Sequence, residues 1–397
     1  MNSTAMLFDL PSVGQCSVLD LGGLYAELEK LSDKRKSRGK RYSLALVIVL
    51  AVLAKLCGED RPYGMAQWVS AREQGLRMAL GVTRQRLPCL NTFRRVLQGA
   101  VNLRQLQKTL NRFVSRRARM GYGTLIAMDG KSMRHTLIPG YERPLHLLAA
   151  YVPTEGVVLW QVALASTENE ITAAPRLLRC VDLRQKIVMG DAIFTQRELS
   201  MQIVQAGGDY IWLAKQNQAR LHEAIAQLFA PQPRTPGWGA PPHDFQTAVT
   251  HDKAHGRLEK RSLTSSELLN HYLDWPHVAQ VFKLERHRTQ LNTGECHTEI
   301  VYGATSLSRQ QADAARLLAS VRDYWGIENG LHHRRDVTLR EDDTRITHPA
   351  LAQAMASLNN LVIALTRQLG WPCLPQARRH YDAHPLEALA LLLHPPG

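Results

Sequence analysis

The segment from Thr124 to Asn217 constrains the fold most, because strand-like and helix-like runs follow one another in it in a definite order. Three apolar runs of strand length come first, separated by turn residues: Thr124–Ser132, Leu145–Val152 and Val157–Ser166. A helical stretch, a strand, a second helix and a last strand follow, at residues 171–179, 186–194, 196–206 and 209–217. This order predicts an α/β protein with a mixed five-stranded sheet and helices on its faces.

The rest of the 397 residues divides around this segment. Residues 1–120 predict an all-helical N-terminal domain and 121–217 the first part of the α/β core. Residues 218–307 predict a β-rich insertion, which a Pro/Gly-rich linker, Ala230–Asp244, introduces. Residues 308–397 predict helices that complete the core, with long amphipathic candidates at 310–333 and 350–369.

One apolar stretch, Leu44–Leu56, follows a basic run and could be mistaken for a membrane anchor. It is interrupted by Lys55 and is shorter than the roughly 20 residues that a bilayer span needs, so it predicts a buried helix. The six cysteines are scattered without a C-x-x-C pair and indicate thiols in a reducing compartment. We therefore expect a cytoplasmic, nucleoid-associated protein without a membrane partner.

The charge favours a polyanionic partner. The chain has 49 Lys plus Arg against 35 Asp plus Glu, a net charge of +14, and 37 of the basic residues are Arg. The guanidinium fork matches phosphate oxygens two at a time, which suits DNA or RNA. Arg-rich codon usage in a GC-rich genome would give the same excess.

A candidate DNA-reading helix lies in Thr83–Gly99. Its Asn91-Thr92 pair predicts an N-cap, followed by a short helix that carries Arg94 and Arg95. This pattern fits the second helix of a helix-turn-helix, but it equally fits an ordinary capped helix with solvated arginines.

Two aspartates end apolar strands: Asp129 the first strand and Asp191 the fourth. Neighbouring strand ends converge at one edge of a sheet, and a carboxylate near a core is costly unless it is paired or metal-bound. An aspartate that caps a turn is the alternative.

Glu328 adds a third carboxylate from a predicted long helix. Helical spacing would place Glu328, His332 and Arg335 on one face. Three carboxylates suit a hard divalent cation such as Mg²⁺, although a surface glutamate paired with an arginine would look the same.

At this point a family resemblance appears. The segments AMDGKS, GDAIFTQ, AKQNQ, HGRLEKR and YWGIENGLHHRRDVTLRED, in this order, resemble the DDE transposases of bacterial insertion sequences, specifically the ISAs-type group that includes the H-repeat-associated proteins. The resemblance runs from about Phe8 to Leu393. It implies an RNase H-like core with an insertion before the last acidic residue, and Asp129, Asp191 and Glu328 as the catalytic and metal-binding residues.

The sequence departs from related hairpin-forming transposases at one motif. They carry Tyr, Arg at +3, Glu at +7 and Lys at +14, where this chain has Val321, Tyr324, Glu328 and Arg335. Only the glutamate is retained, so these residues do not imply a hairpin intermediate.

The resemblance implies metal-dependent cleavage of element ends and strand transfer by two Mg²⁺ ions, for which Mn²⁺ can substitute. It also implies a homodimer or higher oligomer on double-stranded DNA. A nuclease or resolvase without strand transfer, and a domesticated DNA-binding protein without catalysis, remain alternatives. The candidate DNA contacts are Arg94, Arg95, Lys131, Arg134, Lys215, Gln218, His255, Arg257, His332 and Arg335.

Two other ligand sites are excluded by spacing. Gly130-Lys131-Ser132 lacks the upstream glycine of a P-loop, since Leu125 occupies that position. His255 and the His332-His333 pair have no Cys or His partners at zinc spacing.

Overall fold

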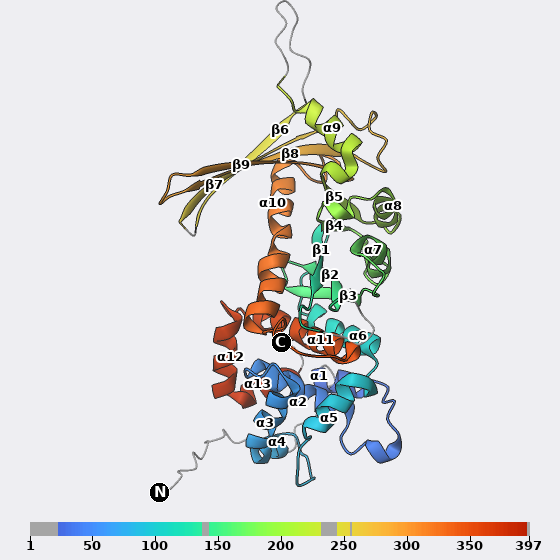
Figure 1. Cartoon of the computed structure of the whole chain (residues 1–397), viewed down its shortest axis with the longest axis vertical. Coiled ribbons are helices and arrows are strands. Elements are labelled where there is room, and N and C mark those ends of the chain that lie inside the picture. The colour runs from blue at the N-terminus through green and yellow to red at the C-terminus, as the bar shows by residue number, and fades with distance from the viewer. Residues whose placement is uncertain (1–22, 137–142, 232–243, 255, 395–397) are drawn as a thin grey trace, which may run out of the picture.

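The computed structural model describes residues 23–136, 143–231, 244–254 and 256–394, and its strands form one nine-stranded sheet (Figure 1). The strand order is β3-β2-β1-β4-β5-β9-β8-β7-β6. The strands are β1 (Thr124–Ser132), β2 (His146–Val152), β3 (Val157–Ala163), β4 (Lys186–Gly190), β5 (Asp209–Ala214), β6 (Gln246–Ala254), β7 (Arg257–Ser266), β8 (Gln280–Gln290) and β9 (Cys296–Thr305).

The first five strands confirm the predicted mixed sheet. β2 pairs antiparallel with both β1 and β3, whereas β1, β4 and β5 are parallel neighbours. The insertion is β-rich, as predicted, but it is not a separate sheet: β9 pairs antiparallel with β5, and β8, β7 and β6 continue outward. β9 thereby covers the edge of β5, whose backbone groups would otherwise be unpaired.

Helices cover both faces of this sheet. Leu177 of α7 (Glu170–Leu178), Ile203 of α8 (Arg197–Gln205) and Ile225 of α9 (Ala219–Leu228) pack into one apolar core with one face. On the other face, α10 (Ala314–Tyr324) packs Leu317, Leu318 and Val321 against residues that include Ile187 and Phe282. In Figure 1, α10 runs from the insertion strands toward the helical end of the molecule.

The N-terminal region is helical, as predicted. Its helices are α1 (Leu24–Glu29), α2 (Leu44–Leu56), α3 (Pro62–Ala71), α4 (Glu73–Ala79), α5 (Leu90–Arg95) and α6 (Leu103–Ser115), with short 3₁₀ and π turns at Ser37–Gly39 and Val96–Ala100. All 13 residues of α2 are buried, and the Ser43 side chain caps its first turn by accepting a hydrogen bond from Leu46 N. Burial lowers the pKa of Lys55 to about 8, and its ammonium lies 3.6 Å from Asp60.

Among the described residues, no helix combines the length and apolar character that a membrane span requires.

The last three helices, α11 (Pro349–Gln368), α12 (Leu374–Ala383) and α13 (Pro385–Leu393), share an apolar core with the N-terminal helices. Arg378 of α12 links the last helices to the N-terminal helices, because its guanidinium donates to Lys55 O and Asp60 Oδ1. It also donates to Thr338 O. Helices α1–α6 and α11–α13 therefore form one helical body (Figure 1). The division of the chain at residues 120, 217 and 307 stays a prediction.

Two local predictions were wrong. The helix that carries Arg94 begins at Leu90 with Cys89 at its N-cap, so Asn91-Thr92 does not cap it. Of the long helix predicted over residues 310–333, only Ala314–Tyr324 forms the α-helix α10. The chain then continues into two π-helical turns, Glu328–His332 and Arg334–Thr338. The Pro/Gly-rich linker, apart from its end residues, lies outside the described residues.

Candidate active site

Asp129 in β1 and Asp191, the residue after β4, occupy matching positions on neighbouring parallel segments. β1 and β4 pair with Met128 opposite Gly190, so each aspartate is the next residue beyond that pair. Asp129 Oδ1 accepts a hydrogen bond from Gly130 N at 2.9 Å, and Asp191 Oδ1 accepts one from Ala192 N at 2.7 Å. Asp191 also caps the 3₁₀ turn Ala192–Phe194, so it does make the turn-capping bond that the sequence left open.

Glu328 reaches Asp129 from the π-helical turn η5 (Glu328–His332). Bonding from i to i+5 widens the turn, and such turns occur often at functional sites. Gly330 lets η5 lie close to β2, because a Cβ at this position would lie 2.6 Å from Tyr151 Oη. One ligand atom each of Asp129, Glu328 and His332 then lies within 4.8 Å of the others.

His332 was expected to contact DNA, but the structure places it inside the site. The residue is only 4% exposed, and its Nε2 lies 3.3 Å from Asp129 Oδ2. Neither ring nitrogen makes a hydrogen bond among the described residues. A buried polar atom without a partner costs about 1–3 kcal/mol, which a bound cation would offset. The donor set therefore fits a divalent ion, with two carboxylates that suit Mg²⁺ or Mn²⁺ and an imidazole that adds a nitrogen donor.

Tyr324 is a site residue that the sequence reasoning did not assign. Burial raises the pKa of its hydroxyl above the usual range, and the negative charges of Asp129 and Asp191 raise it further. The hydroxyl is therefore a neutral hydrogen-bond donor close to both carboxylates. The sequence does mark this position: Tyr324 stands at +3 of the motif that related hairpin-forming transposases carry, where they have Arg.

Two family models match this chain, one over the N-terminal helices and one over the core. Residues 123–365 match the family model of the transposase DDE domain, and residues 25–114 match a second model described as DDE_Tnp_1-associated. This chain belongs to the DDE transposase family.

Curated relatives of this transposase family are similar over part or most of their length. "H repeat-associated putative transposase YhhI" of Escherichia coli K12 is 28% identical over 244 residues, 60% of this chain and 63% of that protein. "Putative protein YbfL" of the same strain has the same identity and coverage, so the match spans less than two thirds of these two relatives. "Putative transposase YncI" of Escherichia coli O157:H7 is 25% identical over 351 residues, 88% of each chain.

A solved structure is also similar. The "Cryo-EM structure of piggyBac transposase synaptic complex with hairpin DNA (SNHP)" aligns with a TM-score of 0.43 and 10% identity, over 92% of this chain and 78% of that one.

Two of the basic residues expected to bind DNA are buried and paired with acidic residues instead. Arg335 is fully buried and pairs with Glu341, from its Nη2 to Oε1 at 2.5 Å and from its Nε to Oε2. The shared face expected for Glu328, His332 and Arg335 is confirmed for the first two, which lie together at the site, but is wrong for Arg335. Lys131 is buried as well, with its Nζ paired to Asp336 and 3.4 Å from Asp342. Neither cation is open to a phosphate.

The other expected DNA contacts are more accessible. Lys215 is exposed and lies 3.4 Å from Asp191, which places one cation beside the site. Arg134 is exposed with its Nε 3.4 Å from Asp342, whereas the half-buried Gln218 side chain donates to Thr195 O. Arg94 and Arg95 are exposed on α5, and Arg257 is half-buried at the start of β7. His255 lies outside the described residues.

A basic cavity of about 820 Å³ lies between the helical body and the segment before α11. Arg61 at the start of α3 and Arg94 line it from one side. His135, Arg345 and His348 line it from the core and from the segment before α11, and two acidic residues, Asp60 and Asp343, also line it. Arg61 donates to Asp343 O at 3.2 Å across this boundary.

Proposed function

We propose that this protein cuts DNA at the ends of a mobile element and joins the cut ends to target DNA, using divalent cations held by Asp129, Asp191 and Glu328. The observation that carries the proposal is that Glu328 of a π-helical turn lies with Asp129 of β1, while Asp191 follows the neighbouring parallel strand β4 at the matching position. Family membership supports the reaction class.

The carboxylates supply the negative charge and oxygen donors that hold Mg²⁺, or Mn²⁺ in its place. When bound, such ions activate the attacking oxygen and neutralise charge on the phosphodiester. Asp191 lies outside the group formed by Asp129, Glu328 and His332, although its strand neighbours that of Asp129. Asp129, Asp191 and Glu328 would together hold the two ions that the family resemblance implies.

The other residues of the site orient the acidic side chains and neutralise phosphate charge. His332 holds Asp129 Oδ2 or binds an ion directly, because its ring nitrogens have no other partner among the described residues. Tyr324 offers a neutral hydroxyl that can donate to a phosphate oxygen or to either aspartate. Lys215 places a cation next to Asp191, where it can contact a flanking phosphate.

The basic cavity supports DNA as the partner. Arg61, Arg94 and Arg345 converge on it from elements far apart in the sequence. Three guanidinium groups that face one space suit bidentate contacts to successive phosphates. We propose that DNA flanking the cleavage point occupies this cavity, and that two copies of the chain act together in the cytoplasm to hold two element ends.

End-labelled DNA that carries the element's terminal repeats tests this function. Incubation with the full-length protein and Mg²⁺ should give 3′-OH ends at the element boundary, followed by products joined to target DNA. Cleavage without joined products would favour a nuclease or resolvase. Binding without cleavage, in Mg²⁺ and in Mn²⁺, would contradict the proposal and favour a non-catalytic DNA-binding protein.

A further inference from the structure

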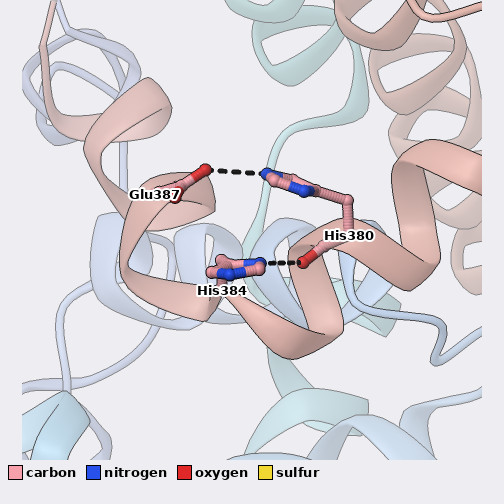
Figure 2. Close-up of side chains that lie close together, drawn as sticks. All are labelled: His380, His384 and Glu387. Atoms are coloured by element: carbon pink, nitrogen blue, oxygen red, sulfur yellow. Dashed lines mark hydrogen bonds and ion pairs between the residues drawn. The ribbon is translucent and has the colours of Figure 1, made fainter. Parts of the chain in front are cut away.

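A second cluster of side chains that could ligate a metal, distinct from the acidic site, lies at the corner between α12 and α13 (Figure 2). His380 lies in the last turn of α12, His384 between the two helices, and Glu387 in the first turn of α13. One ligand atom of each residue lies within 4.8 Å of the others. His380 Nε2 and Glu387 Oε2 are 2.8 Å apart.

The chemistry of this cluster differs from that of the acidic site. Two imidazoles and one carboxylate are a ligand set of Zn²⁺, which leaves a fourth position for water. Imidazole nitrogen suits zinc and other late transition metals, whereas Mg²⁺ prefers oxygen. The His-x₃-His spacing places both rings on the same side of the corner, where the chain turns at Pro385.

The His384 ring is oriented by a hydrogen bond of the kind that supports metal-binding histidines. His384 Nδ1 lies 3.0 Å from the backbone oxygen of His380, so Nδ1 carries the proton and donates it. The lone pair is then on Nε2, and hydrogen bonding of the other ring nitrogen to a carbonyl is a typical support for a metal-binding histidine. The His380 and His384 rings are stacked with centroids 4.6 Å apart.

The backbone around the cluster is fixed by packing. Trp371 lies against the His380 ring, with centroids 5.0 Å apart, and donates from Nε1 to Tyr381 Oη. Ala388, Leu389 and Leu392 of α13 are buried in the core shared with α2. Zn–N bonds of about 2.0–2.1 Å place tetrahedral ligands roughly 3.4 Å apart, so small side-chain rotations suffice to close the site.

We propose that His380, His384 and Glu387 bind one Zn²⁺ ion that fastens α13 to α12 and stabilises the helical body. The ion would be separate from the cations of the acidic site. The cluster shares no residue with the acidic site or with the lining of the basic cavity, so the effect expected of the ion is on the stability of the corner and not on DNA cleavage.

Zinc binding to the untagged full-length protein tests the proposal. The Asp129→Asn/Glu328→Gln double variant is used as the background, so that the acidic site does not contribute. After treatment with EDTA and dialysis, titration calorimetry should show about one Zn²⁺ per chain, and added Zn²⁺ should raise Tm. Mg²⁺ at the same concentration should do neither.

Ligand variants in that background decide the location. His384→Ala and Glu387→Gln should each weaken zinc binding roughly tenfold or more and remove the rise in Tm. His297→Ala, which changes an exposed histidine on β9, is the matched control and should bind as the background does. Equal zinc binding in the background and both ligand variants, or no binding in the background, would overturn the proposal. Circular dichroism of each variant shows whether the fold is retained, and Glu387→Gln, at an exposed position, tests the ligand role without altering the core.

Discussion

His332 and Asp129 face each other across the candidate active site, with Nε2 3.3 Å from Oδ2. The histidine comes from a π-helical turn and the aspartate from β1, and the histidine is almost fully buried. A buried imidazole with no hydrogen bond among the described residues, next to a carboxylate, indicates a ligand or a group that orients one.

Removal of the imidazole should therefore impair metal use. We expect His332→Asn to lower the cleavage rate about 10–100-fold and to raise the concentration of Mg²⁺ needed for half-maximal activity. Mn²⁺ should restore part of the rate. The control is His333→Ala, which changes the exposed neighbour. An unchanged metal requirement in His332→Asn would exclude a role at the metal site.

Arg335 should be a stability residue. Arg335→Met leaves Glu341 buried without its partner, and the loss of one member of a buried ion pair costs about 3–5 kcal/mol. Urea unfolding should show this loss, whereas Arg334→Met, at a half-buried neighbour, should change the free energy of unfolding by less than about 1 kcal/mol. The double variant Arg335→Met/Glu341→Leu should recover most of the unfolding free energy that Arg335→Met loses. Equal stability of Arg335→Met and the wild type would contradict the buried pair.

The same pair predicts a pH dependence. Burial favours the neutral acid, but the charge and hydrogen bonds of Arg335 outweigh it and hold the pKa of Glu341 below its ordinary value of 4.5. The ion pair's stabilisation is thus fully present above pH 4.5 and is lost as the pH falls through the lower folded-state pKa. The difference in unfolding free energy between the wild type and Glu341→Gln should be constant from pH 7 to about 5 and shrink below 4.5. A difference that stays constant down to pH 3 would show that Glu341 does not titrate in this way.

The basic cavity distinguishes two adjacent arginines. Arg94 lines it and Arg95 does not, although a helix-turn-helix interpretation would use both. Arg94→Ala should weaken DNA binding and reduce the slope of log K against log salt by about 0.9, the loss of one phosphate contact. Arg95→Ala is the matched control. Equal effects of the two variants would favour groove reading by α5 over binding in the cavity.

Much of the fold followed from local pattern. Strand-length apolar runs placed β1, β2, β4 and β5 within a few residues, and the end of β4 placed Asp191, whereas β1 was expected to end at Asp129 and continues to Ser132. These features depend on short-range periodicity and on general rules of sheet order.

Other features depend on contacts between distant residues. No sequence pattern marks the switch from α10 to a π-helical turn at Glu328, so the expected face of Arg335 was wrong. Lys131 looked like a phosphate ligand because its partners, Asp336 and Asp342, lie more than 200 residues away in the chain. The His380, His384 and Glu387 cluster needs the corner between two helices to form, although His-x₃-His is a signal that could have found it.

The most direct test of the proposed function is to compare cleavage and binding in Glu328→Gln. The substitution keeps the size of the side chain and removes its charge, and Asn329→Ala, at an exposed neighbour, is the control. With end-labelled DNA and Mg²⁺, we expect Glu328→Gln to bind with nearly wild-type affinity and to give no cleavage, while the control cleaves normally. Wild-type cleavage by Glu328→Gln would contradict the assignment of Asp129, Asp191 and Glu328 as the metal-binding residues.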